Sequence, residues 1–173
     1  MELEDLEDLF EDLDAAVLKT EQLHRIYGIY LNDFVHSDLF FEGKKVIVNT
    51  GLVRSKREGY FVNKQISFDH IVTRENKYSG KRQYDKDRAN KIHWIRVIIE
   101  NCTHPSIKMF EKVDRSGNRN ILLWYEEKNY VVILREKRPD LFLVTGYCVD
   151  VIEQGRFRSE YKAYKNKKTS LRK

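Results

Sequence analysis

Apolar residues recur at helical spacing over residues 2–35. Steps of three and four positions separate the members of this series, which are Leu3, Leu6, Phe10, Leu13, Val17, Thr20, His24, Tyr27, Leu31 and Phe34. Such heptad spacing predicts one or two helices. Two arrangements follow from it. The helices pack on the rest of the chain, which the polar members Thr20 and His24 favour, or residues 3–34 form a coiled-coil dimer.

After residue 37 the pattern changes to one typical of strands. Segments 44–48 and 60–73 are rich in β-branched and aromatic residues, with Gly51 and Gly59 as turn residues. Residues 74–88 are polar and predict an exposed loop. A helix is expected over 85–101, with Asp85 or Asp87 as its N-cap. Three further strands, 120–126, 130–135 and 141–149, are separated by short turns and therefore predict antiparallel hairpins.

These elements predict an α+β fold, with N-terminal helices and a further helix packed on an antiparallel β-sheet. We divide the chain into an acidic amphipathic helical segment (1–38), a main domain (39–165) and a basic C-terminal tail (166–173). A chain of 173 residues is one ordinary domain, and a hydrophobic content of 41% argues against wholesale disorder. The longest apolar runs, 95–99 and 130–134, are far shorter than the roughly 20 residues of a membrane span.

The net charge of +5 is unevenly distributed. Residues 1–14 contain eight acidic residues and no basic one, so the rest of the chain is strongly basic. From Arg156 onward, Glu160 is the single acid. The basic residues of this part are Arg156, Arg158, Lys162, Lys165, Lys167, Lys168, Arg172 and Lys173. A basic body suits a polyanion such as nucleic acid, although a solvated basic surface is the alternative. The acidic segment could also fold back over a basic cleft and inhibit it.

The sequence also indicates the compartment. The acidic first residues are unlike a secretory signal peptide. Cys102 and Cys148 form neither a CxxC pair nor a disulfide framework. We therefore expect a cytoplasmic protein in a reducing environment.

Common catalytic and nucleotide-binding motifs are absent from the sequence. It has no GxxxxGK[ST], GxGxxG or GxSxG motif, and its five histidines lack metal-binding spacing. In the helix expected at 85–101, His93, Arg96 and Glu100 share one face, and Arg88 and Lys91 lie in its first turns. Cations beside an imidazole suit phosphodiester chemistry, because they neutralise the phosphorane while histidine moves a proton. A solvated helix face explains the same pattern.

Two strand segments carry further candidates. If 68–72 is a strand, Phe68, His70 and Val72 face one side, so His70 is either a core residue or a base at the floor of a cleft. In the last strand, Thr145 and Tyr147 share a face and could bind a phosphate oxygen, although both are also ordinary strand formers.

A magnesium-dependent nuclease is an alternative. Glu126 and Lys128 form an ExK tripeptide, and Asp114 lies upstream. In such enzymes the acids hold the metal and the lysine assists the attacking water. A charged hairpin turn explains this tripeptide more simply.

Four segments together resemble a phage-borne nuclease family of the barnase–EndoU–colicin–RelE-like fold. They are 68–73 (FDHIVT), 87–99 (DRANKIHWIRVII), 130–134 (YVVIL) and 143–147 (LVTGY). The matched elements are Phe-x-His-Ile, the Arg-x-x-(Lys/Arg)-Ile-x-Trp-Ile helix and the Thr-(Ala/Gly)-Tyr strand. The likeness covers roughly residues 40–165. One departure is Gly146, where the family pattern leads us to expect alanine.

The resemblance implies a barnase/RelE-like fold and a metal-independent endoribonuclease of toxin or phage type, which needs no metal or other cofactor. It makes His70, Arg88, Lys91, Thr145 and Tyr147 the site residues, with His93 as a second acid or base. We expect RNA to be bound also by Arg96, Lys162, Lys165, Lys167 and Lys168. An antitoxin or immunity protein is a further partner to consider. The alternative is a basic nucleic-acid-binding module without catalysis.

Overall fold

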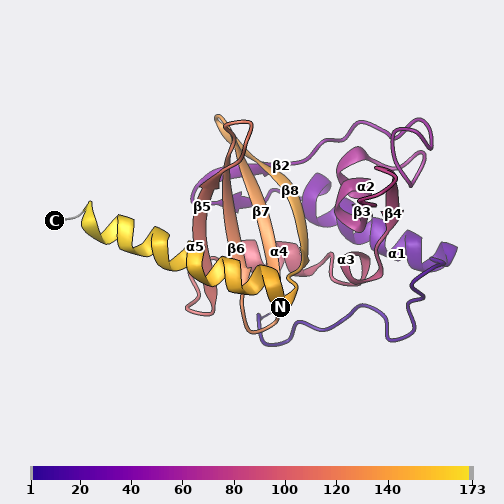
Figure 1. The fold of residues 1–173 in the computed structure, drawn as a ribbon. Coiled ribbons are helices and arrows are strands. Elements are labelled where there is room, and N and C mark those ends of the chain that lie inside the picture. The colour runs from indigo at the N-terminus through magenta and orange to yellow at the C-terminus, as the bar shows by residue number, and fades with distance from the viewer. Residues whose placement is uncertain (1, 172–173) are drawn as a thin grey trace.

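The computed structural model describes residues 2–171, which form a mixed helical and β-sheet structure (Figure 1). Its helices are α1 (Thr20–Leu31), α2 (Ile66–Val72), α3 (Lys86–Asn90), α4 (Trp94–Glu100) and α5 (Val151–Ser170), and the π-helical segment η1 (Asn32–His36) continues α1. Its strands are β1 (Phe40–Phe41), β2 (Lys44–Ile47), β3 (Thr73–Glu75), β4 (Arg82–Tyr84), β5 (Ile107–Val113), β6 (Arg119–Tyr125), β7 (Tyr130–Lys137) and β8 (Asp140–Cys148). The predicted α+β class is confirmed.

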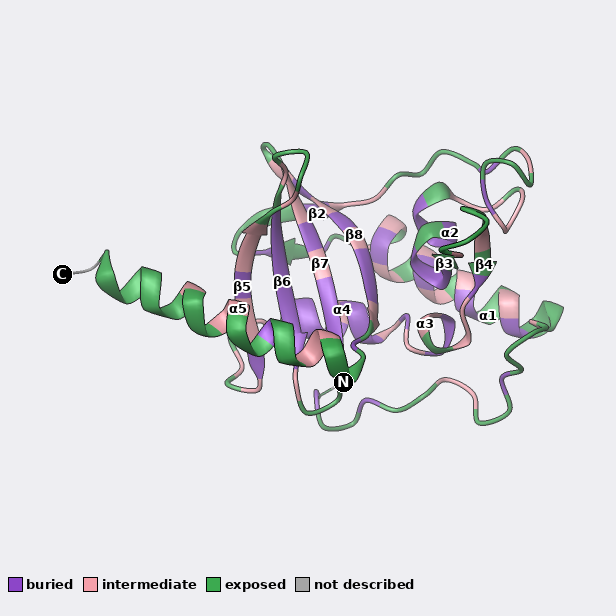
Figure 2. Cartoon of the chain, in the orientation of Figure 1, coloured by how far each residue is buried: buried purple, intermediate pink, exposed green. Residues whose placement is uncertain are grey.

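A six-stranded sheet has the order β1-β2-β8-β7-β6-β5, and β3 and β4 form a separate hairpin. From β5 to β8, each strand pairs antiparallel with the next, so the predicted hairpins are confirmed. Strand β2 pairs parallel with β8. In Figure 1, α4 lies behind this sheet and α5 crosses in front of it. The strands between these helices are mostly buried, whereas α5 is mostly exposed (Figure 2).

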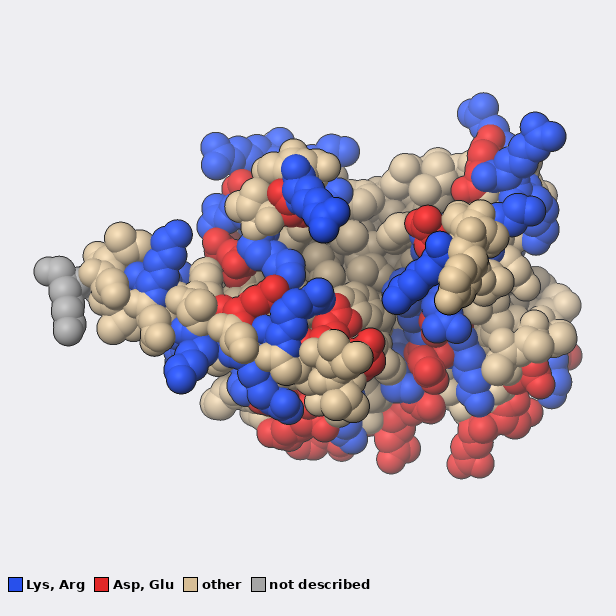
Figure 3. All heavy atoms as spheres, in the orientation of Figure 1, with Lys and Arg blue, Asp and Glu red and all other residues tan. Residues whose placement is uncertain are grey.

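Helix α5 covers only part of the front face of the sheet. Phe157 packs there against Phe110 and Trp124, with ring centroids 5.4 and 5.5 Å apart. On the front of β8, Tyr147 near the end of the strand packs against this cluster, and the earlier part of β8 is not covered by α5. It borders a hollow between the sheet and the part of the molecule that contains α2 (Figure 3).

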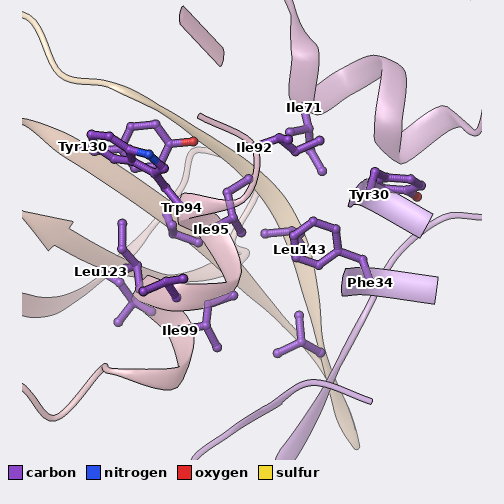
Figure 4. Packing of buried hydrophobic residues seen from close by; sticks show 14 of the residues in the cluster. Tyr30, Phe34, Ile71, Ile92, Trp94, Ile95, Ile99, Leu123, Tyr130 and Leu143 are labelled. Atoms are coloured by element: carbon purple, nitrogen blue, oxygen red, sulfur yellow. The ribbon is translucent and has the colours of Figure 1, made fainter. Parts of the chain in front are cut away.

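The main core lies behind the sheet, where α4 packs against β6, β7 and β8. Ile92, Ile95 and Ile99 on this side of the sheet are all buried. Figure 4 shows them with Leu123, Tyr130 and Leu143 from the strands. Burial of such aliphatic and aromatic side chains is the main stabilising contribution to the fold. It fixes the back of the sheet and leaves part of its front face free.

The predicted helix over 2–35 is wrong in its first half. Residues 2–19 form an irregular strap, and the helix begins at Thr20. Leu3, Leu6 and Leu13 are nevertheless buried in the core of their own chain, with exposed fractions of 1%, 1% and 2%. Four of the eight acids are aspartates, which favour turns and helix caps, and the leucines gain more by entering the core than by lining a helix. A continuous seam for a coiled coil over 3–34 is therefore not formed.

Asn90 holds the middle of this strap. Its side-chain Oδ1 accepts a hydrogen bond from the Phe10 backbone N–H, and its Nδ2 donates to the Phe10 carbonyl, both at 2.9 Å. The Trp94 indole N–H donates to the Glu7 carbonyl at 2.9 Å. An unpaired buried amide is costly, so these bonds fix the strap as part of the fold. The domain boundary at residue 38 therefore separates parts of one structure that share a core.

The predicted strand over 60–73 is also wrong, because residues 66–72 form α2. Phe68, Ile71 and Val72 are buried at spacings of three and four, which is a helical pattern. In a helix, residues two positions apart point in nearly opposite directions, so Phe68 is buried while His70 is exposed. Tertiary packing has overridden the β-propensity of this segment.

The predicted helix over 85–101 is two helices. A turn at 91–93 separates α3 from α4. Ile92 within this turn and Trp94 at the start of α4 are both buried. Asp85 is the N-cap of α3, as predicted, and its side chain accepts from the Arg88 backbone N–H.

The boundary predicted at residue 166 falls inside α5, which runs unbroken from residue 151 to residue 170. Residues 172 and 173 of the predicted tail lie outside the described residues. No helix within residues 2–171 has the length and apolar character that crossing a bilayer requires.

Candidate active site

A groove follows the front face of β8, between the sheet and α2. Cavities of about 660, 310 and 360 Å³ lie along it, from the beginning of β8 to the beginning of α5. Phe142 lines the first two cavities and Glu153 the third.

Side chains of β7 and β8 form the floor of the groove. Ile133 pairs with Thr145 and Val131 with Tyr147 across the two strands. Paired residues point to the same face of a sheet, so Thr145 and Tyr147 share this face, as predicted.

Arg88 extends from α3 to this floor. Its Nη1 donates to the Thr73 carbonyl at 2.9 Å and to Thr145 Oγ1 at 3.4 Å. Its Cζ lies 5.2 Å from the centroid of the Tyr147 ring. The structure thus brings together three predicted site residues, Arg88, Thr145 and Tyr147, although 57 positions separate the first two.

A second arginine, Arg82 on β4, ties α2 to Arg88. Its Nη2 donates to the carbonyls of His70 and Thr73, each at 2.9 Å, and its Nε donates to Thr73 Oγ1 at 2.6 Å. The Thr73 carbonyl therefore accepts from both guanidinium groups. Burial lowers the pKa of Arg82, and the carboxylate of Asp69, 3.8 Å from Nε, acts in the opposite direction.

His70 lies at the end of α2 beside these arginines. It lines the 310 Å³ cavity together with Arg135 and Phe142. Partial burial lowers the pKa of His70 to about 4, and the positive charges of Arg82, Arg88 and Arg135 act in the same direction. Part of His70 is still exposed to solvent, which screens these charges. The lowered pKa makes His70 neutral at pH 7 and able to accept a proton.

Tyr147 places a phenol hydroxyl near the beginning of α5. Its hydroxyl donates to Glu153 Oε1 on α5 at 2.9 Å. Burial raises the pKa of Tyr147, and the charge of Glu153 raises it further. The phenol therefore keeps its proton at neutral pH.

Lys91 and His93 lie away from this groove. Lys91 Nζ forms an ion pair with Asp8 of the strap at 2.7 Å and lies near Cys148, which faces the opposite side of β8 from Tyr147. His93 is partly buried beside the strap, and burial lowers its pKa. The acidic strap does fold back, and around the α3–α4 turn it contacts Asn90, Lys91 and Trp94. The turn that separates α3 from α4 directs these two predicted site residues toward the strap.

Arg96 links α4 to another part of the fold. Its Nη1 donates to the Asp33 carbonyl at 2.8 Å, and its Nε pairs with Glu100 at 2.8 Å. It therefore ties α4 to the end of η1 and does not reach the groove. The four predicted RNA-binding lysines lie on the exposed surface of α5. They are Lys162, Lys165, Lys167 and Lys168.

The residues of the alternative magnesium site are not assembled. Asp114 and Glu126 lie beyond opposite ends of the seven-residue strand β6, about 20 Å or more apart. Glu126 pairs with Lys108 and Arg158, and Asp114 accepts hydrogen bonds from Asn118 in its own turn. The separation excludes a metal site formed by these two carboxylates.

Arg82 and Arg135 were not predicted as site residues. Arg82 was hidden in the polar stretch 74–88, where nothing in the sequence distinguishes β4 from a loop. Arg135 could have been found, because Val131, Ile133 and Arg135 alternate along a predicted strand and share one face. The histidine that they surround was predicted, but on the wrong type of element.

Comparison of the chain with protein-family models, with curated proteins and with solved structures finds no match.

Proposed function

We propose that the protein is a metal-independent endoribonuclease whose active site is the groove along β8. The observation that supports this most is the placement of Arg88 on Thr145 and Tyr147, beside a histidine that is neutral at pH 7. Together they supply a cation for a phosphate, a proton acceptor and a proton donor. These are the groups that cleavage of RNA by its own 2′-hydroxyl requires.

In the proposed reaction, His70 accepts the proton of the 2′-hydroxyl as this oxygen attacks the adjacent phosphorus. The O2′–P bond forms and the P–O5′ bond breaks, which leaves a 2′,3′-cyclic phosphate and a 5′-hydroxyl. Tyr147 donates a proton to the departing O5′, and the proton on His70 later returns to Tyr147 through solvent. No oxidant or reductant takes part.

The arginines would stabilise the negative charge of the pentacoordinate phosphorus. Arg88 is already oriented by Thr73, Thr145 and Tyr147, so it loses little freedom when phosphate binds. The carboxylate oxygen Oδ2 of Asp85 lies 3.9 Å from Arg88 Nε, which is too far for a hydrogen bond. A guanidinium held in this way can offer its other N–H groups to two phosphate oxygens.

The test is cleavage of mixed RNA by the purified protein in excess EDTA, compared with His70→Ala. The proposal expects cyclic phosphate ends and a loss of about a hundredfold in the variant, the usual scale for removing an acid or base. His36→Ala is the matched control, because His36 ends η1 and lies outside the groove. Equal cleavage by wild type and His70→Ala would remove His70 from the mechanism. Binding of RNA without cleavage would favour a nucleic-acid-binding module.

A further inference from the structure

The largest cavity of the groove lies next to the proposed active site and has no part in the proposed reaction. It has a volume of about 660 Å³ and is bordered by the β2 end, the β5–β6 turn and the β7–β8 hairpin. Asn49, Arg135 and Phe142 line both this cavity and the 310 Å³ cavity that contains His70. The two cavities therefore adjoin each other.

One wall of the larger cavity is formed by the aromatic ring of Phe142, and the ammonium group of Lys137 lies over this ring. Phe142 is partly exposed, and Lys137 Nζ lies 5.8 Å from the centroid of its ring. Unpaired nucleic-acid bases bind proteins by stacking on such aromatic rings. Lys137 adds a positive charge for the backbone of the same nucleotide.

Two amides offer complementary hydrogen-bonding groups in the same cavity. Asn118 Nδ2 donates to the carboxylate of Asp114, which fixes the amide and leaves Oδ1 as an acceptor. Asn49 Oδ1 accepts from the Gly51 backbone N–H, which leaves Nδ2 as a donor. Neither Asn49 Nδ2 nor Asn118 Oδ1 has a hydrogen-bond partner among residues 2–171.

Arg135 stands between the two cavities in a fixed orientation. Its Nε donates to Asn120 Oδ1 at 3.0 Å, and its Nη2 donates to Asp114 Oδ2 at 3.3 Å. A guanidinium held at this position can contact the phosphate that joins a nucleotide in the larger cavity to one beside His70.

We propose that the 660 Å³ cavity binds the base of an unpaired nucleotide next to the cleaved phosphodiester, with Phe142 as the stacking surface. The substrate is then single-stranded RNA, because a base held in a duplex cannot enter the cavity. This inference rests on the proposed function for the choice of RNA as the ligand.

The test is a binding measurement that does not depend on cleavage. The ligand is a 2′-O-methyl RNA of about ten nucleotides, which lacks the attacking hydroxyl, used as a single strand and as a duplex at one fixed salt concentration. Phe142→Ala should weaken binding of the single strand by about five- to a hundredfold, the range for loss of one base stack. It should leave duplex binding within about twofold of wild type, because the duplex contacts only charges.

Two variants make this result specific. Phe142→Tyr keeps the aromatic face and should keep wild-type affinity. Phe40→Ala removes a 54% exposed ring on β1, outside the groove, and should have no effect. Equal affinity of Phe142→Ala and wild type for the single strand would overturn the proposal, and so would an equal loss for single strand and duplex. If RNA is not cleaved but binding depends on Phe142, the proposed function fails and the base site stands.

Discussion

Arg88 lies over the ring of Tyr147, with 5.2 Å between its Cζ and the ring centroid. One side chain comes from α3 and the other from the last strand of the sheet. Because the guanidinium is planar, contact with the ring and the two oxygen acceptors fix its orientation as well as its position. A lysine at this position would carry the same charge without that orientation.

We therefore expect Arg88→Lys to lower single-turnover cleavage by about a hundredfold, the scale of losing one oriented transition-state donor. The measurement is the rate at saturating RNA, with circular dichroism as the check on folding. Arg74→Lys is the control. Arg74 also lies near Asp85, at 3.6 Å, but its side chain is 67% exposed. Wild-type cleavage by Arg88→Lys would show that charge alone is sufficient.

Gly146 is required by packing behind the site. A Cβ there would lie 2.7 Å from Ile95 Cγ1 and 2.7 Å from Tyr130 Oη, closer than carbon atoms approach. Gly146→Ala should therefore lower the free energy of unfolding by about 1–3 kcal/mol, the usual cost of overpacking a core. Urea denaturation measures this change.

Two further variants test the reason for this loss. Adding Tyr130→Phe to Gly146→Ala removes one of the two clashing atoms and should restore part of the stability. Gly155→Ala on α5 meets no atom within 4 Å and should stabilise by about 0.5–1 kcal/mol, because alanine is the better helix former. A destabilising Gly155→Ala, or a harmless Gly146→Ala, would contradict this account.

The sequence was sufficient for the β-meander and for two of the floor residues. Period-two alternation and short turns identify strands such as β7 and β8, and alternation alone puts Thr145 and Tyr147 on one face. The sequence led to wrong predictions where tertiary contacts decide the structure. The heptad leucines of the strap are equally suitable for a helix and for burial as single anchors, and only the core that receives them makes the distinction.

We expect the strap to contribute to stability and not to inhibit the groove. Leu6→Ala should cost about 2–5 kcal/mol of unfolding free energy, as expected for a leucine that is 1% exposed. Asp8→Asn should cost less than about 1 kcal/mol, because Asp8 is 45% exposed and solvent screens its pair with Lys91. Neither variant should raise RNA cleavage per folded molecule. An increase with Asp8→Asn would show that the acidic segment inhibits the enzyme.

The lysines of α5 should act on affinity and not on chemistry. Replacing Lys162, Lys165, Lys167 and Lys168 together with glutamine should weaken RNA binding in a salt-dependent way. Each phosphate contact on a single strand contributes about 0.7 to the slope of the logarithm of the RNA-binding constant against the logarithm of the salt concentration. If all four lysines contact phosphates, the magnitude of this slope should therefore fall by about 3. The rate at saturating RNA should stay near wild type. An unchanged slope would show that α5 does not contact RNA.

The pH dependence of cleavage tests His70 most directly. Because its pKa is lowered from 6.5 to about 4, the proton-accepting form should persist into mildly acidic solution. The acid limb of kcat/KM should then have its midpoint below 6.5 and be absent in His70→Ala. Arg135→Gln removes one of the charges that act on His70 and should move the midpoint upward, whereas Arg138→Gln, at an 82% exposed position, should not.

The unfolded chain takes up this proton near pH 6.5 and the folded chain only at lower pH, so folding stability falls over this window as the pH decreases. Circular dichroism at each pH separates that loss from the titration of the base, and a midpoint at or above 6.5 would exclude His70 with its lowered pKa as the proton acceptor.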